Sequence, residues 1–348
     1  MNLSSLKSKT LQHVAFLTGM PSAGTKLQIA DRLQSSLGKS RLSSEGCRIL
    51  SVDMGIRNLA YCVVDVPKPS RLEENKLQVQ SWRRLDLLDR LKPEGLTLPQ
   101  KEEDVNEKPC GRRKSKASAT ANAILKDAFT PSVMSKAALG VANDFLRYKP
   151  DVILIERQRF RSGGGSAIQE WTVRVNTLES MLWACFETMR FTQLQGGSSI
   201  FPALYEVAPK RVAGFWTAPP DTHLPPANLL ADGYTPAVDE KGVIGKTKAA
   251  SAVKKEKIAV LRSWLDSSGG VSLEFSPETQ TTAEAFATGP RRRQGKKAGI
   301  DADDELTSVR ETKLDDLADC VLQAAAWVRW EENRRAILEA VSEQEFLR

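Results

Sequence analysis

Two apolar, β-branched segments of this chain each end in an acidic residue. Asp53 follows the run C-R-I-L-S-V, and Glu156 follows the run D-V-I-L-I. A carboxylate at the end of a buried strand is costly unless a cation or a hydrogen bond meets it. An aspartate at a strand end is more often a turn former or a cap, so either residue alone indicates little. Together they are candidates for a cation-binding site.

A further acidic group opens the last apolar-periodic segment, K-L-D-D-L-A-D-C-V-L. On a helix, Asp315 and Asp319 lie about 40° apart and Asp316 and Asp319 about 60° apart, beside the apolar stripe. Acids near a helix start also favour the helix dipole, which is the alternative role for all three. We interpret Asp319, with Asp315 or Asp316, as the third contributor to the same site.

The expected chemistry is metal-dependent cleavage of a DNA phosphodiester. Clustered carboxylates stay ionised only with cations between them, and such hard oxygen ligands select Mg²⁺, with Mn²⁺ expected to substitute. Two such ions about 4 Å apart activate a water and stabilise the leaving oxygen of a phosphodiester. Histidine sites are excluded, because only His13 and His223 are present, and the 5 cysteines lack the short paired spacings of zinc sites.

Basic residues directly follow two of the expected strands, the one that ends at Glu156 and the one over 201–207. Lys210, in V-A-P-K-R-V, either reaches the scissile phosphate or is an exposed lysine in the first turn of a helix. A second group directly follows the fourth strand and precedes a glycine-rich loop, and it suits phosphate contacts and insertion into an opened base stack. A solvated basic loop is the alternative. This group consists of Arg157, Arg159, Phe160 and Arg161.

The composition favours a polyanionic partner and excludes a membrane span. The formal net charge is +7 and the pI is about 9.1. Basic residues cluster at Lys254 and Lys255, with Lys257 close by, where they face phosphate or solvent. No segment approaches the roughly 18 to 20 consecutive apolar residues that a transmembrane helix needs. We therefore expect DNA as a partner and no membrane association.

The order of the periodic segments predicts an α/β protein with the RNase H-like fold, a mixed five-stranded sheet flanked by helices. In that fold, the strands that end at Asp53 and Glu156 are neighbours at the centre of the sheet. Strands are expected over 47–53, 58–66, 77–86, 151–156 and 201–207, and helices over 133–148, 167–185, 210–216, 246–265 and from 314 onward.

The first 40 residues differ from the rest and predict a small separate module. Helical spacing of leucines, followed by G-M-P-S-A-G-T-K-L-Q-I-A-D-R-L, resembles the SAP motif, a small helix-turn-helix module that binds DNA. Lys26 is its candidate phosphate contact. The resulting division is a SAP-like module over 1–40 and an RNase H-like domain over 46–348, with polar insertions near 93–128, 217–245 and 270–312.

Four blocks of the chain resemble the fungal mitochondrial Holliday junction resolvases, relatives of the bacterial RuvC resolvases. They are S-V-D-M-G-I-R-N-L-A-Y-C, I-E-R-Q-R-F-R-S-G-G, W-T-V-R-V-N-T-L-E-S-M-L and K-L-D-D-L-A-D-C-V-L. The resemblance implies paired nicking of four-way DNA junctions by a homodimer in the mitochondrial matrix. It assigns metal binding to Asp53, Glu156, Asp316 and Asp319, with Asp315 as an adjoining acid. The helix over 167–185 is the candidate dimer element, with packing on the sheet as its alternative.

Two other classes of protein remain to be weighed. The segment D-M-G-I-R-N also looks like the first phosphate loop of actin-like ATPases and sugar kinases, but that fold requires a second D-x-G loop near mid-chain, which is missing. A non-catalytic DNA-binding scaffold would leave the acids as caps. Cleavage of a synthetic junction distinguishes the scaffold from the nuclease.

Overall fold

The structure is a computed structural model of the 348-residue chain. It describes residues 3–38, 41–43, 45–68, 76–88, 129–158, 169–197, 201–223, 250–288 and 314–346. The predicted insertion near 93–128 lies outside the described residues, as does most of the one near 217–245.

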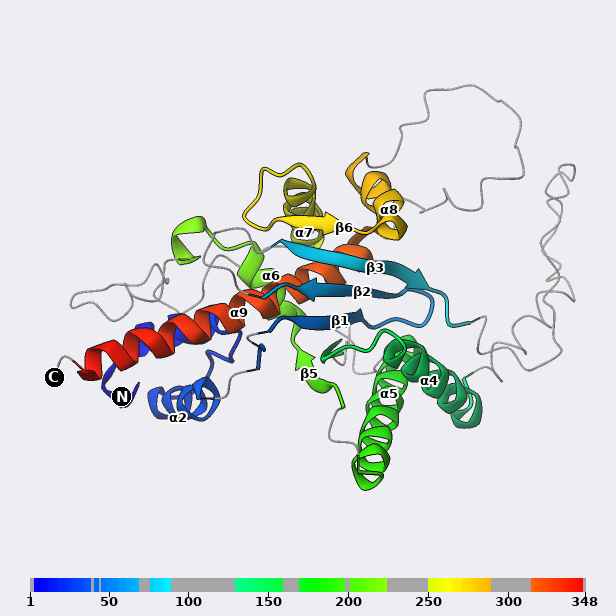
Figure 1. Cartoon of the computed structure of the whole chain (residues 1–348), viewed down its shortest axis with the longest axis horizontal. Helices are drawn as coiled ribbons and strands as arrows, with labels where there is room; N and C mark the ends of the chain where they lie inside the picture. Colours follow the sequence, from blue (N-terminus) through cyan, green and yellow to red (C-terminus); the bar gives the residue numbers. More distant parts are fainter. Residues whose placement is uncertain are drawn as a thin grey trace, which may run out of the picture.

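A six-stranded mixed sheet forms the centre of the molecule, in the order β5-β4-β1-β2-β3-β6 (Figure 1). The hairpin expected around Gly55 is present, since β1 and β2 pair antiparallel, while β4 runs parallel to β1. The predicted neighbourhood of the first and fourth strands is therefore confirmed. The strands are β1 (Cys47–Asp53), β2 (Leu59–Val66), β3 (Leu77–Leu85), β4 (Val152–Glu156), β5 (Ala203–Val207) and β6 (Leu273–Phe275).

The sixth strand was not predicted from the sequence. β6 pairs with the edge strand β3, and α8 (Pro277–Thr288) follows it. Both lie in the segment near 270–312 that the sequence predicts to be a polar insertion, and within it 273–275 form a strand and 277–288 a helix. A strand of 3 residues carries too few side chains to show a period of two. Its pairing with β3 is what defines it.

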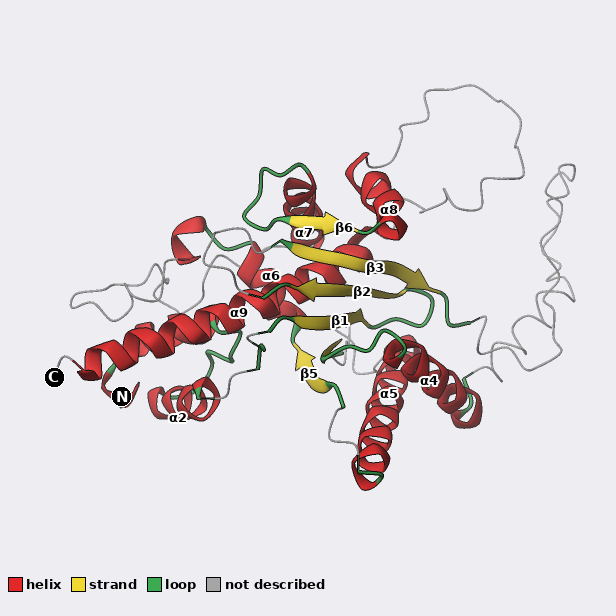
Figure 2. Ribbon diagram, in the orientation of Figure 1, coloured by secondary structure: helices red, strands yellow, loops and turns green. Residues whose placement is uncertain are grey.

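Helices cover both faces of the sheet, which explains why β1, β2 and β4 are nearly continuous apolar runs (Figure 2). One core lies between the sheet and α4 with α5, and the other lies between the opposite face and α6 to α9. These helices are α4 (Pro131–Leu146), α5 (Glu170–Gln195), α6 (Pro209–Trp216), α7 (Ala250–Leu265) and α9 (Leu314–Phe346). No described helix is long and apolar enough to cross a lipid bilayer.

The N-terminal helices dock on the far half of α9 (Figure 1). The two predicted helices are present as α1 (Ser8–Leu17) and α2 (Lys26–Leu37), and a capping box between Thr25 and Gln28 begins α2. Their apolar side chains form a core that includes Ile337 of α9. Helices α1 and α2 therefore share buried surface with the last helix of the sheet domain.

A buried arginine fixes this docking. Arg334 donates to the Ser36 hydroxyl at 2.6 Å and to the Thr18 carbonyl at 3.0 Å, and it is ion-paired with Glu331 at 3.1 Å. Gly19 is needed at the contact, because its φ is +65° and a Cβ there would lie 2.3 Å from the Trp330 ring. These contacts hold the N-terminal helices in one orientation relative to the sheet.

Candidate active site

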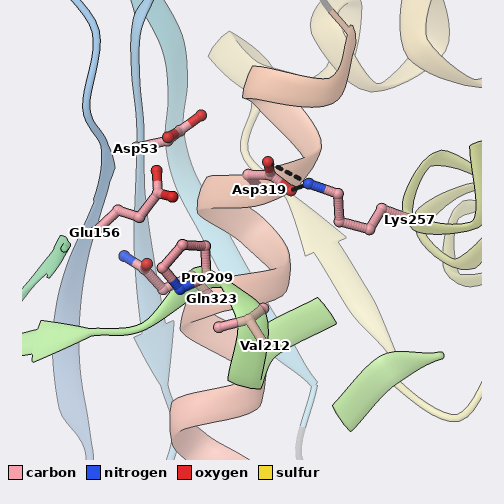
Figure 3. A pocket seen from close by; sticks show the side chains of 7 residues that line it. All are labelled: Asp53, Glu156, Pro209, Val212, Lys257, Asp319 and Gln323. Atoms are coloured by element: carbon pink, nitrogen blue, oxygen red, sulfur yellow. Dashed lines mark hydrogen bonds and ion pairs between the residues drawn. The ribbon is translucent and has the colours of Figure 1, made fainter. Parts of the chain in front are cut away.

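A pocket opens where the carboxyl ends of the two central strands meet α9 (Figure 3). Such a position follows from the topology, since parallel neighbouring strands end at the same edge of a sheet. The side chains that line it come from five separate segments of the chain. They are Asp53, Glu156, Pro209, Val212, Lys257, Asp319 and Gln323.

The sheet register brings the first two acids side by side. Val52 is paired with Ile155 in the parallel ladder between β1 and β4, so the next residues, Asp53 and Glu156, are neighbours. Their carboxyl groups lie close together in Figure 3. Burial raises the pKa of Asp53 well above its usual range, and the charge of Glu156 raises it further. Two adjacent acids of this kind require a cation to remain ionised together.

Gln323 ties α9 to both of these strands. Its amide Nε2 lies 3.0 Å from the Ser51 hydroxyl, 3.2 Å from the Val52 carbonyl oxygen and 3.4 Å from the Leu154 carbonyl oxygen. These acceptors belong to β1 and β4, immediately below the two acids. Asp319 lies one helical turn before Gln323, so the buried amide sets the position of Asp319 over the strand ends.

Asp319 is ion-paired with a lysine from α7. Lys257 donates to both carboxylate oxygens of Asp319 at 2.5 Å, and the Lys257 side chain is only 12% exposed. Burial raises the pKa of Asp319 to about 6, against the opposing effect of Lys257. Sequence reasoning placed Lys257 only in a basic cluster. A sequence pattern that could have indicated the pairing is the spacing of the two lysines and the two acids, each about one helical turn. Lys254 and Lys257 of α7 pair with Asp315 and Asp319 of α9.

The two adjacent acids of α9 have different surroundings. Asp315 accepts a short hydrogen bond from Lys254 and so faces α7. Asp316 is among the charges that raise the pKa of Asp53. Burial raises the pKa of Asp316 itself to about 6, and the charges of Asp315 and Asp319 add to this effect. Asp316 is therefore the one whose charge acts on Asp53, whereas Asp315 is held by Lys254.

The structure does not bring every predicted residue into the pocket. Lys210 is exposed in the first turn of α6, while its neighbour Pro209 lines the pocket instead. Arg157 is paired with Glu206 at 3.4 Å on the surface. Lys26 and Lys255 are exposed on α2 and α7, and Arg159, Phe160 and Arg161 lie outside the described residues.

The donors in the pocket suit a hard divalent cation, because they are carboxylate oxygens with an amide beside them. Among the described residues, no three acidic, histidine or cysteine side chains are arranged to enclose an ion. The Lys257 ammonium is hydrogen-bonded to both oxygens of Asp319. The oxygen donors of the pocket are of the kind that binds a divalent metal ion. For Asp319 to bind such an ion, its carboxylate has to release the Lys257 ammonium.

Comparisons with known proteins show relatives that span most of this chain. Residues 49–337 match the family model described as mitochondrial resolvase Ydc2 / RNA splicing MRS1. The chain is 26% identical over 330 residues to the mitochondrial cruciform cutting endonuclease 1 of Schizosaccharomyces pombe, with 94% of each protein covered. It is 21% identical to the Saccharomyces cerevisiae protein of the same name, with 97% of this chain and 85% of that protein covered.

A solved structure shows the same fold. The crystal structure of the yeast mitochondrial Holliday junction resolvase Ydc2 superposes with a TM-score of 0.53 at 20% identity, covering 97% of this chain and 99% of that one. The predicted RNase H-like fold is confirmed, with six strands in the sheet in place of five. Since the family model spans most of the sequence, the chain belongs to the mitochondrial resolvase Ydc2 / RNA splicing MRS1 family.

Proposed function

We propose that this protein is a metal-dependent endonuclease that resolves four-way DNA junctions in mitochondria. The observation that carries the proposal is the pocket in which Asp53, Glu156 and Asp319 meet from three separate elements. Family membership supports it, since relatives that span nearly the whole chain are named mitochondrial cruciform cutting endonucleases. Four-way junctions are the substrate class, and recombination of mitochondrial DNA is the process in which such junctions arise.

The carboxylates hold the metal in this proposal. Asp53, Glu156, Asp316 and Asp319 are the ligands, while Asp315 keeps Lys254 beside them. Mg²⁺ is the expected ion, with Mn²⁺ able to replace it, and when bound it supplies an activated water and charge neutralisation at the cut phosphodiester. The protein's own contribution is to orient the acids through the β1–β4 register and through Gln323. Pro209 and Val212 close one side of the pocket.

The basic residues outside the pocket are proposed to hold the DNA backbone. The described members of this group are exposed and so open to phosphates: Lys26, Arg157, Lys210, Lys254 and Lys255. Each phosphate contact would make the affinity fall more steeply as the salt concentration rises. Because α1 and α2 are docked rigidly on α9, the SAP-like module would present Lys26 at a fixed place relative to the pocket. Three residues outside the described part of the structure complete the group: Arg159 and Arg161 as proposed phosphate contacts, and Phe160 for insertion into an opened base stack.

We further propose that the protein acts as a homodimer through α5. A four-way junction has two symmetry-related cutting positions, and a two-fold dimer offers one pocket to each. Trp171, Val173, Phe191 and Leu194 of α5 are 41 to 64% exposed, an unusual set for one helix. Phe191→Glu should convert the dimer to a monomer in light scattering, whereas Glu187→Gln on the same helix should not. A monomeric wild-type protein would contradict this assignment.

RNA binding without cleavage is the second candidate, because the family description also names RNA splicing. The acidic pocket argues against it. Uncompensated carboxylates repel a nucleic acid backbone, so a protein that only binds RNA gains nothing from burying them at the strand ends. Membership of this family also removes support for the actin-like ATPase alternative.

Cleavage of a synthetic four-way junction tests the proposal. The wild-type protein should nick paired strands with Mg²⁺ and be inactive in EDTA, and Asp53→Asn should lose cutting by at least about 10³-fold while it still binds the junction. Asp266→Asn, an exposed acid on the surface, is the matched control and should cut normally. Normal cutting by Asp53→Asn would reject the site, and binding without cutting by the wild type would favour the RNA-binding or scaffold class.

A further inference from the structure

Arg84 of β3 lies in the same cross-strand row as the acids of the pocket. Asp53 is paired with Ala60, and Ala60 is paired with Arg84, so the three side chains project from one face of the sheet. This is the face that α9 covers, since Trp82, two residues earlier, donates to the Leu317 carbonyl at 2.9 Å. With strands about 4.8 Å apart, Arg84 begins about 10 Å from Asp53.

One guanidinium nitrogen of Arg84 finds no acceptor among the described residues. Its Nη1 is buried and has no hydrogen-bond partner, and Arg84 makes no ion pair with any described residue. The adjacent Arg83 behaves differently, because it projects from the opposite face and is paired with Glu278 at 3.2 Å on the surface. A buried charged donor without an acceptor is rare and destabilising, so its retention next to a pocket calls for an acceptor from outside.

The charge pattern around Arg84 indicates which acceptor fits. Arg84 lies near the first turn of α9, where it lowers the pKa of Asp316 against the effect of burial. The acids line the β1–β4 side of the pocket, Lys257 is held by Asp319, and Lys254 is held by Asp315. Arg84 is therefore a described cation at this edge that forms no ion pair with a described carboxylate, although its charge acts on Asp316. A planar guanidinium with free donors matches a phosphodiester, which accepts two parallel hydrogen bonds.

We propose that Arg84 forms a phosphate-binding subsite for the DNA strand being cut, and that it takes the phosphate next to the scissile one. This inference rests on the proposed nuclease function and deepens it. The cut phosphate lies at the acids, and the separation of about 10 Å places Arg84 beyond it along the strand. The contact fixes the strand's register over the metal-binding carboxylates without taking part in bond breakage.

Binding measurements in an Asp53→Asn background test this subsite without cleavage. Arg84→Gln should weaken junction binding about tenfold and reduce the slope of log K against log salt by about 0.9, the value for one phosphate contact. Arg84→Lys, which keeps the charge, should retain most of that slope. Arg83→Gln is the matched control from the neighbouring position and should change neither quantity. Thermal unfolding of each variant checks that the fold is intact.

A junction with a single neutral methylphosphonate linkage identifies the phosphate. A methylphosphonate next to the cut position should weaken junction binding by the protein that retains Arg84. It should cause no further loss of binding in Arg84→Gln, because that variant already lacks the contact between Arg84 and the phosphate. Equal losses in both proteins would overturn the subsite. The subsite would also be overturned if Arg84→Gln bound the junction normally but bound Mn²⁺ more weakly. That result would make Arg84 a positioning residue for Asp316. None of these measurements depends on cleavage. The subsite can therefore fail while the nuclease proposal holds, and a failure of the nuclease proposal is seen only in the cleavage assay.

Discussion

The ammonium of Lys257 lies 2.5 Å from both carboxylate oxygens of Asp319, although the two residues are 62 positions apart in the sequence. Asp319 lines a pocket with two further acids, so the ammonium stands beside the place where a divalent cation would bind. It neutralises one carboxylate in the absence of metal. The same contact makes Lys257 a competitor for the oxygens that a metal requires.

Removal of this ammonium should strengthen metal binding. Lys257→Gln deletes the competing cation and so makes the net charge of the pocket more negative by one, and we expect Mn²⁺ affinity to rise about tenfold, or about 1.4 kcal/mol. Isothermal titration with Mn²⁺ measures it. Lys255→Gln, an exposed residue of the same helix, should bind Mn²⁺ as the wild type does. Unchanged or weaker binding in Lys257→Gln would mean that the lysine supports the metal site.

The response to metal should depend on pH. Folding raises the pKa of Asp316 and Asp319 from the ordinary value of 3.8 to about 6, so the folded protein without metal binds more protons than the unfolded chain in that window. Its stability in EDTA therefore falls as the pH rises through this window. Above pH 6 the ionised acids are free to bind metal.

Thermal unfolding with and without Mg²⁺ should detect this change. We expect Mg²⁺ to raise the Tm at pH 7.5 and to leave it nearly unchanged at pH 5, where protons occupy the ligands. Asp319→Asn should lose most of the Mg²⁺ effect at pH 7.5. An equal rise of the Tm at both pH values in the wild-type protein would show that these carboxyls do not control metal binding.

Loss of the Gln323 amide should affect both stability and the site. Gln323→Met keeps the approximate shape but removes donors to acceptors on β1 and β4, and we expect the free energy of unfolding in urea to fall by about 1–3 kcal/mol. Mn²⁺ binding should weaken as well, because Asp319 loses its fixed position. Gln280→Met, on the exposed face of α8, controls for the substitution itself. A stability loss without weaker Mn²⁺ binding would limit Gln323 to a structural role.

Arg334 should control whether the N-terminal helices stay docked. Arg334→Met leaves Glu331 as a buried charge that lacks its nearest partner, so we expect a loss of about 3–5 kcal/mol. Hydrogen exchange over residues 8–37 should become faster, since the contacts to Thr18 and Ser36 are gone. The double variant with Glu331→Leu should recover part of the stability. No recovery would show that the hydrogen bonds to the N-terminal helices matter more than the ion pair.

Much of the fold could be predicted from the sequence because its signals are local. Runs of β-branched residues defined β1, β2 and β4, helical spacing defined α4, α6 and α9, and both N-terminal helices were found in place. The acids Asp53 and Glu156 could be assigned to strand ends for the same reason. The strand β6 escaped prediction because 3 residues show no period, and only its pairing with β3 makes it a strand.

The partners of the site residues were decided by the tertiary structure. The sequence established that acids end two apolar strands and open the last helix, because that pattern is written in consecutive residues. It contained no sign that Lys257 holds Asp319, that Gln323 reaches Ser51 across 272 positions, or that Arg84 is left without an acceptor. A local period specifies which face of an element is apolar. Which charged group meets another depends on how distant elements pack, and that is settled only when the whole core forms.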